Sequence, residues 1–131
     1  MTRSPTPTDL RYTKDHEWTR QKGDTIVVGI TAFAVEQLGD ITLVDLPAAG
    51  TSLEKGKTFG VVESVKSVSD LYAPVTGTVV AVNAALADKP ELVNEAPYES
   101  GWMLEIRPAN PADLAELLDA TAYDAHVATS G

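Results

Sequence analysis

Lys66 is the residue whose position most strongly suggests chemistry, because it stands where the chain should reverse direction without the usual turn residues. Valine-rich segments at residues 58–63 and 68–72 flank it and are typical of short strands. A tight turn between strands normally uses Gly, Asn, Asp or Pro. A broken local rule of this kind is expected at functional sites. We therefore interpret Lys66 as a side chain presented for enzymatic modification, the alternative being an ordinary solvated lysine.

Two acidic residues, Glu63 and Asp70, lie close to Lys66 in the sequence, one on each side. Two interpretations are open for them. An exposed ion pair with Lys66 would contribute only about 0.2–1 kcal/mol to stability. If Lys66 is modified, the two acids are instead candidates for recognition by the modifying enzyme.

The two histidines, His16 and His126, form no recognisable catalytic or metal site. Neither has the spacing of a metal-ligand pair. Two histidines cannot complete a three-ligand catalytic zinc site without carboxylates. An acid–base pair of His16 with Glu17 would make the chain a stand-alone enzyme, but adjacent strand residues face opposite sides of a sheet. We therefore predict no self-sufficient active site.

Residues 50–58 contain a Gly-Lys-Thr sequence that invites comparison with a phosphate-binding loop. That motif has four residues between its first glycine and Gly-Lys-Thr, whereas this stretch has five. It also leads into a predicted strand, although a phosphate site needs a helix N-terminus at this point. We interpret the stretch as a hairpin turn with solvated lysines, and nucleotide binding is not expected.

The composition describes a soluble globular domain of 131 residues, of which 44% are hydrophobic and 22% are charged. No run approaches the roughly 18 consecutive apolar residues of a membrane helix, and residues 1–9 predict a flexible tail without a signal peptide. The sequence contains no cysteine, which excludes disulfides, thiol catalysis and thiolate metal sites. Any redox chemistry must therefore come from an attached group.

The formal net charge of −9 is unevenly distributed along the chain. Residues 1–90 carry 11 acidic and 9 basic residues, a net of −2, and residues 91–131 carry 8 acidic residues and one basic residue, a net of −7. Nucleic acid is therefore not an expected partner, since phosphate binding requires a basic face. The acidic end either supports solubility or steers the chain towards a partner with a basic surface.

Short strands separated by turn residues dominate the predicted structure. A short helix is predicted over residues 32–38, with Thr31 as its N-cap and Gly39 at its end. The long connection at residues 83–101 has a length that is typical of functional loops or of loops containing a helical turn. The predicted strands are residues 10–18, 25–31, 41–46, 58–63, 68–72, 78–82 and 103–107.

The end of the chain carries the clearest helix signals. Asn110 is a good N-cap, Pro111 suits the first helical position, and Asp113 in the first turn complements the helix dipole. Leu114, Leu117 and Leu118 form an apolar stripe. A helix at about residues 111–125 is therefore predicted, packed on the outside of a β-sandwich or barrel.

The sequence Glu63-Ser64-Val65-Lys66-Ser67, followed by residues 70–83, strongly resembles the lipoylation site of the glycine cleavage system H-protein family. Further segments resemble the same family in order along the chain: residues 16–18, 28–31 with 38–41, 44–47 with 50, and 90–98 before 101–102. The resemblance covers essentially residues 10–125, and Ser67, Thr78 and Ala96 are small departures from it.

The resemblance implies a mainly β fold, the barrel-sandwich hybrid of lipoyl and biotinyl carrier domains, with antiparallel strands, a short internal helix and a C-terminal helix. It implies a single lipoyl-carrier domain over residues 10–131 after the tail at residues 1–9. Lipoate is expected in amide linkage on Lys66, where it supplies the dithiol that a cysteine-free chain lacks. The residues expected to be recognised by the lipoyl-attaching enzyme flank this lysine: Glu63, Ser64, Val65, Ser67 and Asp70.

The function implied by the resemblance is that of a non-catalytic shuttle in glycine catabolism and one-carbon metabolism. It would carry an aminomethyl group from a pyridoxal-phosphate-dependent glycine decarboxylase to a folate-dependent aminomethyltransferase, and electrons to dihydrolipoyl dehydrogenase. In the family, the lipoyl arm with its aminomethyl group rests in a cleft of the protein that shields it from water. We expect this cleft near His16 and Glu17. The expected location is the cytoplasm of a bacterial-type cell, a mature organellar form being the alternative. Neither a metal nor a membrane partner is expected.

Two other carrier roles are alternatives to this one. A lipoyl relay or storage protein serving 2-oxoacid dehydrogenases would have the same fold, and a decarboxylase assay would separate it from a glycine-cleavage shuttle. A biotin carrier is disfavoured because biotinyl lysines usually stand between methionines, whereas Val65 and Ser67 flank Lys66.

Overall fold

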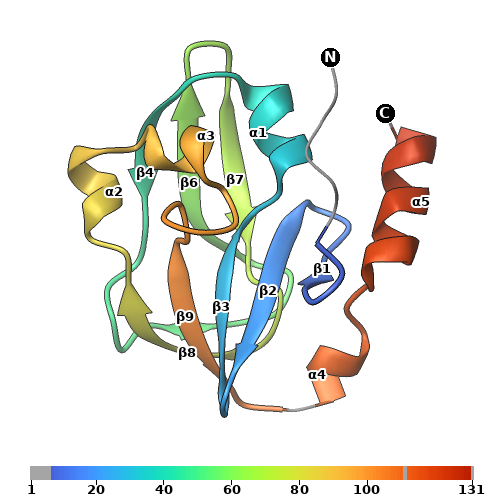
Figure 1. Cartoon of the computed structure of the whole chain (residues 1–131). Coiled ribbons are helices and arrows are strands. Elements are labelled where there is room, and N and C mark those ends of the chain that lie inside the picture. The colour runs from blue at the N-terminus through green and yellow to red at the C-terminus, as the bar shows by residue number, and fades with distance from the viewer. Residues whose placement is uncertain (1–6, 111, 131) are drawn as a thin grey trace.

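The computed structural model describes residues 7–110 and 112–130, and two antiparallel sheets form the body of the molecule (Figure 1). The larger sheet has the strand order β1-β2-β3-β9-β8-β5 and the smaller one the order β4-β6-β7. This sandwich-like arrangement with short helices confirms the predicted fold class. The strands are β1 (Arg11–Tyr12), β2 (Glu17–Lys22), β3 (Thr25–Ile30), β4 (Ile41–Asp45), β5 (Ser52–Leu53), β6 (Thr58–Ser64), β7 (Val68–Tyr72), β8 (Gly77–Val82) and β9 (Leu104–Pro108).

The main hydrophobic core fills the space between the two sheets. Val62 of the smaller sheet and Val28 and Ile106 of the larger one have no exposed surface. Val44 of β4 and Leu46, just after that strand, pack against this core. Full burial of each large apolar side chain contributes about 1.5–3 kcal/mol, so this core determines which face of each strand points inward.

The strand predicted at residues 10–18 is instead two strands, β1 and β2, separated by a turn. The backbone of His16 has a φ of 72°, a conformation that interrupts a strand when a non-glycine residue adopts it. Hydrogen bonds from His16 N to Thr13 O (3.2 Å) and from Thr13 N to Glu17 O (2.9 Å) hold the turn. The break lets Glu17 begin a new strand, β2, which pairs with β3 through a hairpin at Gly23.

The helix predicted at residues 32–38 is confirmed as α1 (Ala32–Leu38). The Thr31 hydroxyl accepts a hydrogen bond from Ala34 N (3.2 Å), and Gly39 ends the helix with a φ of 79°. The long connection at residues 83–101 contains α2 (Ala85–Asp88) and α3 (Leu92–Glu95), in agreement with the helical turn expected there.

The helix predicted at about residues 111–125 is instead two helices, α4 (Ala112–Ala115) and α5 (Ala120–Ser130). The chain is interrupted because Leu118 exchanges two backbone hydrogen bonds with Tyr12, at 2.8 and 2.7 Å. Asp119 then starts the second helix by accepting a hydrogen bond from Ala122 N at 2.8 Å. A long-range pairing with β1 therefore overrides the local helical signals.

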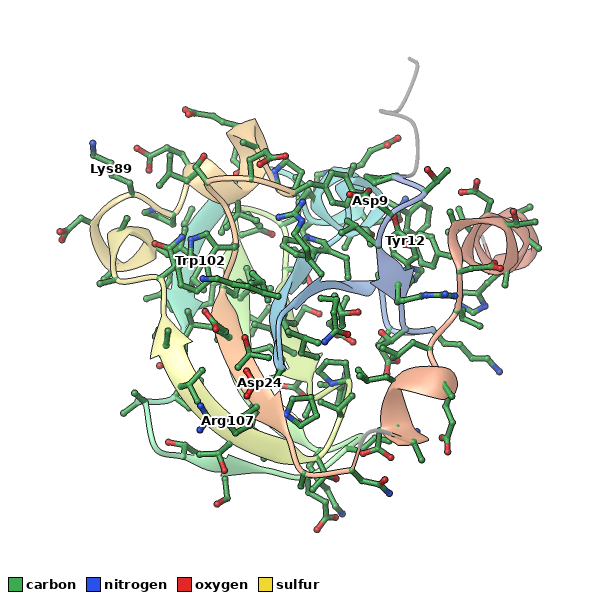
Figure 2. The ribbon with its side chains drawn as sticks, turned by 60° about the horizontal axis from the view of Figure 1, so that its bottom comes forward. Asp9, Tyr12, Asp24, Lys89, Trp102 and Arg107 are labelled. Atoms are coloured by element: carbon green, nitrogen blue, oxygen red, sulfur yellow. The ribbon has the colours of Figure 1, made fainter. Side chains whose placement is uncertain are left out.

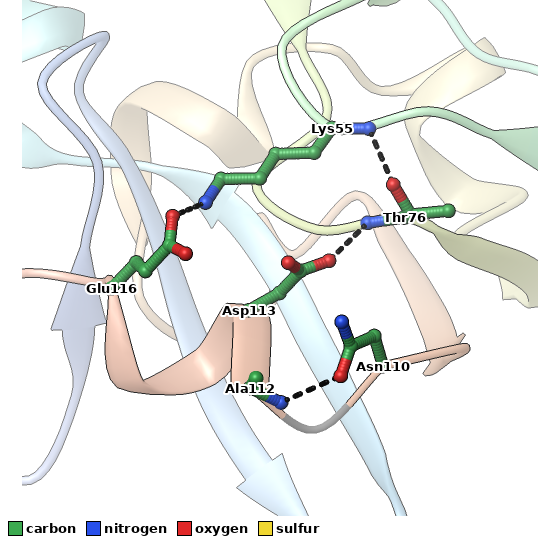
Figure 3. A network of polar contacts seen from close by, with 6 residues as sticks. All are labelled: Lys55, Thr76, Asn110, Ala112, Asp113 and Glu116. Carbon is green, nitrogen blue, oxygen red and sulfur yellow. Dashed lines mark hydrogen bonds and ion pairs between the residues drawn. The ribbon is translucent and has the colours of Figure 1, made fainter.

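Both C-terminal helices are tied to the body of the molecule. The carboxylate of Asp113 in α4 accepts a hydrogen bond from Thr76 N (3.2 Å), and Glu116 forms an ion pair with Lys55 (Figure 3). Tyr123 of α5 stacks on Tyr12 with ring centroids 4.6 Å apart, and Tyr12 lies on the side of the sheet next to this helix (Figure 2). The stack of Tyr123 on Tyr12 belongs to a second buried cluster, which consists of Leu10, Tyr12, Trp18, Ala120, Tyr123 and Val127.

Parts of two predictions fall outside the described residues: positions 1–6 of the predicted tail and Pro111. Leu10, the first residue after that tail, is buried. In the described part of the chain, no helix has the length and apolar content to span a membrane.

Candidate functional site

Lys66 lies at the tip of the hairpin that joins β6 to β7, and this hairpin projects at one end of the molecule (Figure 1). The side chain is exposed. Ser64 N donates a hydrogen bond to Ser67 O (2.8 Å), and the Ser64 hydroxyl accepts hydrogen bonds from Lys66 N (3.2 Å) and Ser67 N (3.1 Å). A serine hydroxyl thus binds the backbone groups of the tip, as in other serine-stabilised turns.

The hairpin tip rests on the segment between α1 and β4. Val65 N donates a hydrogen bond to Asp40 O (3.0 Å). The stem of Lys66 lies over Gly39, where an added Cβ would stand 3.2 Å from the Lys66 Cε atom. Asn94 of α3 holds this segment from below, because its side chain accepts from Ile41 N (2.8 Å) and donates to Gly39 O (2.9 Å). Lys66 therefore stands next to a segment that is fixed by hydrogen bonds.

The two acids near Lys66 lie on neighbouring strands of the smaller sheet. Glu63 of β6 is half-buried and Asp70 of β7 is exposed. None of the ion pairs found among residues 7–110 and 112–130 involves Lys66. Within that range the acids are therefore available to solvent or to a partner rather than neutralised by the lysine.

His16 lies against the C-terminal helix α5. Its Nδ1 atom lies 2.8 Å from the Tyr123 hydroxyl, and its ring lies 4.7 Å from that of Phe33 and 5.6 Å from that of His126. Burial lowers the pKa of His16, and His126 lowers it further. The imidazole is therefore neutral at pH 7 and serves to dock α5.

Glu17 is almost fully buried. Its carboxyl accepts hydrogen bonds from the Thr13 hydroxyl (2.6 Å) and from Tyr72 N (3.3 Å). Burial raises the pKa of Glu17 to about 8, although these hydrogen bonds oppose the shift. The carboxyl therefore holds a proton at neutral pH, which makes it able to donate a hydrogen bond or to protonate an amine.

A pocket of about 320 Å³ opens beside Glu17 and does not include His16. One wall comes from the turn between β1 and β2, another from Ala73 and Pro74 after β7, and a third from the C-terminal segment through Glu116. Lys14, Asp15 and Lys55 also contribute charged groups to its lining. A buried protonated carboxyl in a partly apolar pocket is suited to a ligand with an apolar body and a polar end.

Comparison with known proteins shows the family to which this chain is related. The family model described as glycine cleavage H-protein matches residues 10–130. The chain belongs to the glycine cleavage H-protein family. A glycine cleavage system H protein of Anaeromyxobacter sp. (strain K) is 58% identical over 121 residues, which cover 92% of this chain and 94% of that protein. One from Magnetococcus marinus is 56% identical over 123 residues, covering 94% and 88%.

A solved H-protein structure also matches the fold of this H-protein family member. The crystal structure of a glycine cleavage system H protein from Mycobacterium marinum superimposes with a TM-score of 0.86 and 41% identity, covering 93% of this chain and 98% of that one. The likeness in fold therefore extends over most of both chains.

Three residues of this H-protein family member make structural contacts that the sequence did not predict. Ser64 was expected to be recognised by a partner, yet its hydroxyl also builds the turn. Asn94 of α3 forms a hydrogen bond with the start of β4, and Tyr123 of α5 forms one with His16. A serine in a hairpin can be recognised from the local sequence, whereas no local pattern indicates the roles of Asn94 and Tyr123.

Proposed function

We propose that this chain is a lipoyl-bearing shuttle of the glycine cleavage system, with the lipoyl group in amide linkage on Lys66. It carries an aminomethyl group from a pyridoxal-phosphate-dependent decarboxylase to a folate-dependent aminomethyltransferase, and electrons to dihydrolipoyl dehydrogenase. The observation that carries the proposal is the exposed Lys66 at a projecting hairpin tip, in a chain of the H-protein family. The cytoplasm is the proposed location.

The surroundings of Lys66 suit a covalently attached arm. The amine is exposed and the stem passes over Gly39, where the lack of a side chain leaves room for it. Acylation removes the lysine charge, and the flexible stem lets the group move while the hairpin stays fixed. When bound, the lipoyl group supplies a disulfide–dithiol couple, which this cysteine-free chain lacks. Tethering gives it a high effective concentration at a docked enzyme.

The pocket beside Glu17 is proposed as the resting site of the loaded arm. β7 starts two residues after Lys66 and ends at Tyr72, whose amide donates to Glu17. That strand spans about 13 Å at the usual rise of about 3.3 Å per residue, a distance suited to a long acyl arm. Glu17 can give its proton to an arriving amine and then remain beside it as a carboxylate, so that the pocket shields an amine-bearing cargo from water.

The proposed role is non-catalytic, and the chemistry belongs to the partner enzymes. Residues 91–131 carry a net charge of −7, with 8 acids and one base. A field of this sign increases the encounter rate with partners that present basic surfaces. Glu63, Ser64, Val65, Ser67 and Asp70 are proposed to contribute to recognition by the lipoyl-attaching enzyme.

The first experiment is intact mass measurement and peptide mapping of the protein isolated from lipoate-replete host cells. A lipoyl adduct on Lys66 is expected. Unmodified Lys66 in such cells would rule out the proposed attachment. A second measurement, glycine-dependent CO₂ exchange with the purified decarboxylase, tests the pathway. Lipoylated protein that supports no exchange would point to a relay serving 2-oxoacid dehydrogenases instead.

A further inference from the structure

Three large hydrophobic side chains are notably exposed in the described part of the chain, and all three lie around Lys66. Leu43 of β4 has 44% of its surface exposed, Val65 of the hairpin tip 68%, and Val68 of β7 65%. Single exposed apolar residues are ordinary, but a group of them at one place on a surface marks an interaction site.

The strand register brings two of these residues onto one face of the smaller sheet. Leu43 is paired with Glu63, and Glu63 is paired with Val68. Residues directly opposite one another in antiparallel strands project from the same face. The intervening residue Val62 is fully buried, so this row points away from the core.

A second row on the same face lies two residues further along each strand. Asp45 is paired with Val61, and Val61 is paired with Asp70. Both aspartates are exposed. We call the two rows together the outer β4–β6–β7 face; its residues are Leu43, Asp45, Val61, Glu63, Val68 and Asp70.

The charge of this face is of one sign. The three strands contain no lysine or arginine, and Lys66 is the one base in the hairpin that joins β6 to β7. A second copy of the chain would set acids against acids, which is unfavourable at an interface. A fitting occupant therefore has an apolar contact surface bordered by basic side chains.

The reach of Lys66 narrows the choice of occupant. Once Lys66 is acylated, its long arm can reach an active site at some distance from the hairpin. Before acylation, only the lysine side chain extends from the tip. An enzyme that acylates Nζ must therefore bring its active site to the hairpin itself and cover the side chains beside it. We propose that the outer β4–β6–β7 face is the docking surface of the lipoyl-attaching enzyme, which contacts it through an apolar patch with basic residues around it.

This inference rests on the proposed function and deepens it, since it names the surface that the first partner uses. The reaction forms an amide bond between Lys66 Nζ and the lipoyl carbonyl of an activated donor. It breaks the bond between that carbonyl and its activating group, and the amine releases a proton. Leu43, Val68 and Asp45 take no part in these bonds, so they influence docking alone.

The test measures initial rates of Lys66 acylation by a purified lipoate–protein ligase supplied with lipoate and ATP. Leu43→Thr and Val68→Thr place a β-branched residue, which suits a strand, at each position but remove apolar contact area. Each is expected to raise the KM for the carrier about tenfold, the effect of losing one buried aliphatic contact, with kcat unchanged. A fall in kcat without a change in KM would overturn the docking role.

Charge variants supply an independent arm of the test. Asp45→Lys should raise the KM, and the KM of the unaltered protein should rise with salt, since exposed charge attractions are screened. Asp24→Lys, at the β2–β3 hairpin at the opposite end of the molecule (Figures 1 and 2), and Val80→Thr on β8 are the matched controls and should acylate normally.

The outcomes separate the two proposals. If the unaltered protein is not acylated at Lys66, the proposed function fails. If it is acylated and the Leu43, Val68 and Asp45 variants react with the same KM as the controls, the docking surface alone is refuted. Each variant is compared only if its urea unfolding midpoint equals that of the unaltered protein, which shows that it is folded. Asp45→Lys and Val68→Thr change different residues, so the test can proceed with either one.

Discussion

The carboxyl of Glu17, at the start of β2, accepts a hydrogen bond from the backbone N–H of Tyr72, at the end of β7, over 3.3 Å. This bond joins the two sheets, because β2 belongs to the larger one and β7 to the smaller one. β7, the strand that follows Lys66, thus ends at Tyr72, which is hydrogen-bonded to the Glu17 carboxyl beside the pocket. The Lys66 hairpin and the pocket are therefore parts of one connected structure.

Replacing Glu17 by Gln should change how stability depends on pH. The carboxyl titrates near 4.5 when unfolded and at about 8 when folded. Between these values the folded protein holds a proton that the unfolded chain has lost, so stability falls as pH rises through this window, by about 1.4 kcal/mol per pH unit at most. Glu17→Gln cannot titrate and should lack this component.

Urea unfolding of both proteins at pH 5, 6.5 and 8 checks this prediction. The stability of Glu17→Gln relative to the parent should increase steadily from pH 5 to pH 8. A constant difference across these values would mean that the folded carboxyl titrates normally.

Replacing Tyr123 by Phe should loosen the C-terminal helix. The hydroxyl lies 2.8 Å from His16 Nδ1 and 2.7 Å from Thr31 Oγ1, whereas the ring stacks on Tyr12. Phe keeps the stack and removes both hydrogen bonds, which should lower the free energy of unfolding by about 1–3 kcal/mol. Hydrogen exchange should show faster opening of α5, and unchanged protection there would contradict the role.

Replacing Gly39 by Ala should affect both stability and modification. The backbone there has φ 79° and ψ −153°, a region that costs other residues about 1–3 kcal/mol. The new Cβ would also stand 3.2 Å from the Cε of Lys66. Slower acylation of Lys66 is therefore expected in addition to a lower urea midpoint.

Gly23→Ala is the matched control for this variant. Its φ of 62° is also positive, and a Cβ there meets nothing within 4 Å. It should cost about 1–2 kcal/mol of stability and leave the acylation rate unchanged. Equal acylation rates in the two variants would exclude a steric effect of position 39 on the lysine.

Replacing Lys66 by Arg should abolish function with little effect on the fold. The side chain is exposed and Arg keeps its charge, so the free energy of unfolding should change by less than about 0.5 kcal/mol. The guanidinium cannot take the lipoyl group in the same amide linkage. Glycine-dependent CO₂ exchange should therefore be lost, and retained exchange would refute the role of this lysine.

Much of the fold was determined by local sequence. The helix from Ala32 to Leu38 formed as predicted because its signals, the Thr31 cap and the terminal Gly39, lie within one segment. The β6–β7 hairpin did so because valine-rich strands flank it. By contrast, the break at Leu118 arises from hydrogen bonds with the distant Tyr12, which no local pattern encodes, and the turn before Glu17 depends on a positive φ at His16, which non-glycine residues rarely adopt.

The sequence by itself predicted Lys66 as the group for modification, because residue type, a hairpin position and the absence of cysteine are all visible in one chain. Only the tertiary structure decided that Glu17 is buried against Tyr72 while His16 turns towards Tyr123. It also decided that Leu43, Glu63 and Val68 form one row. The physical reason is that burial, pKa and the register of paired strands depend on residues far apart in the chain.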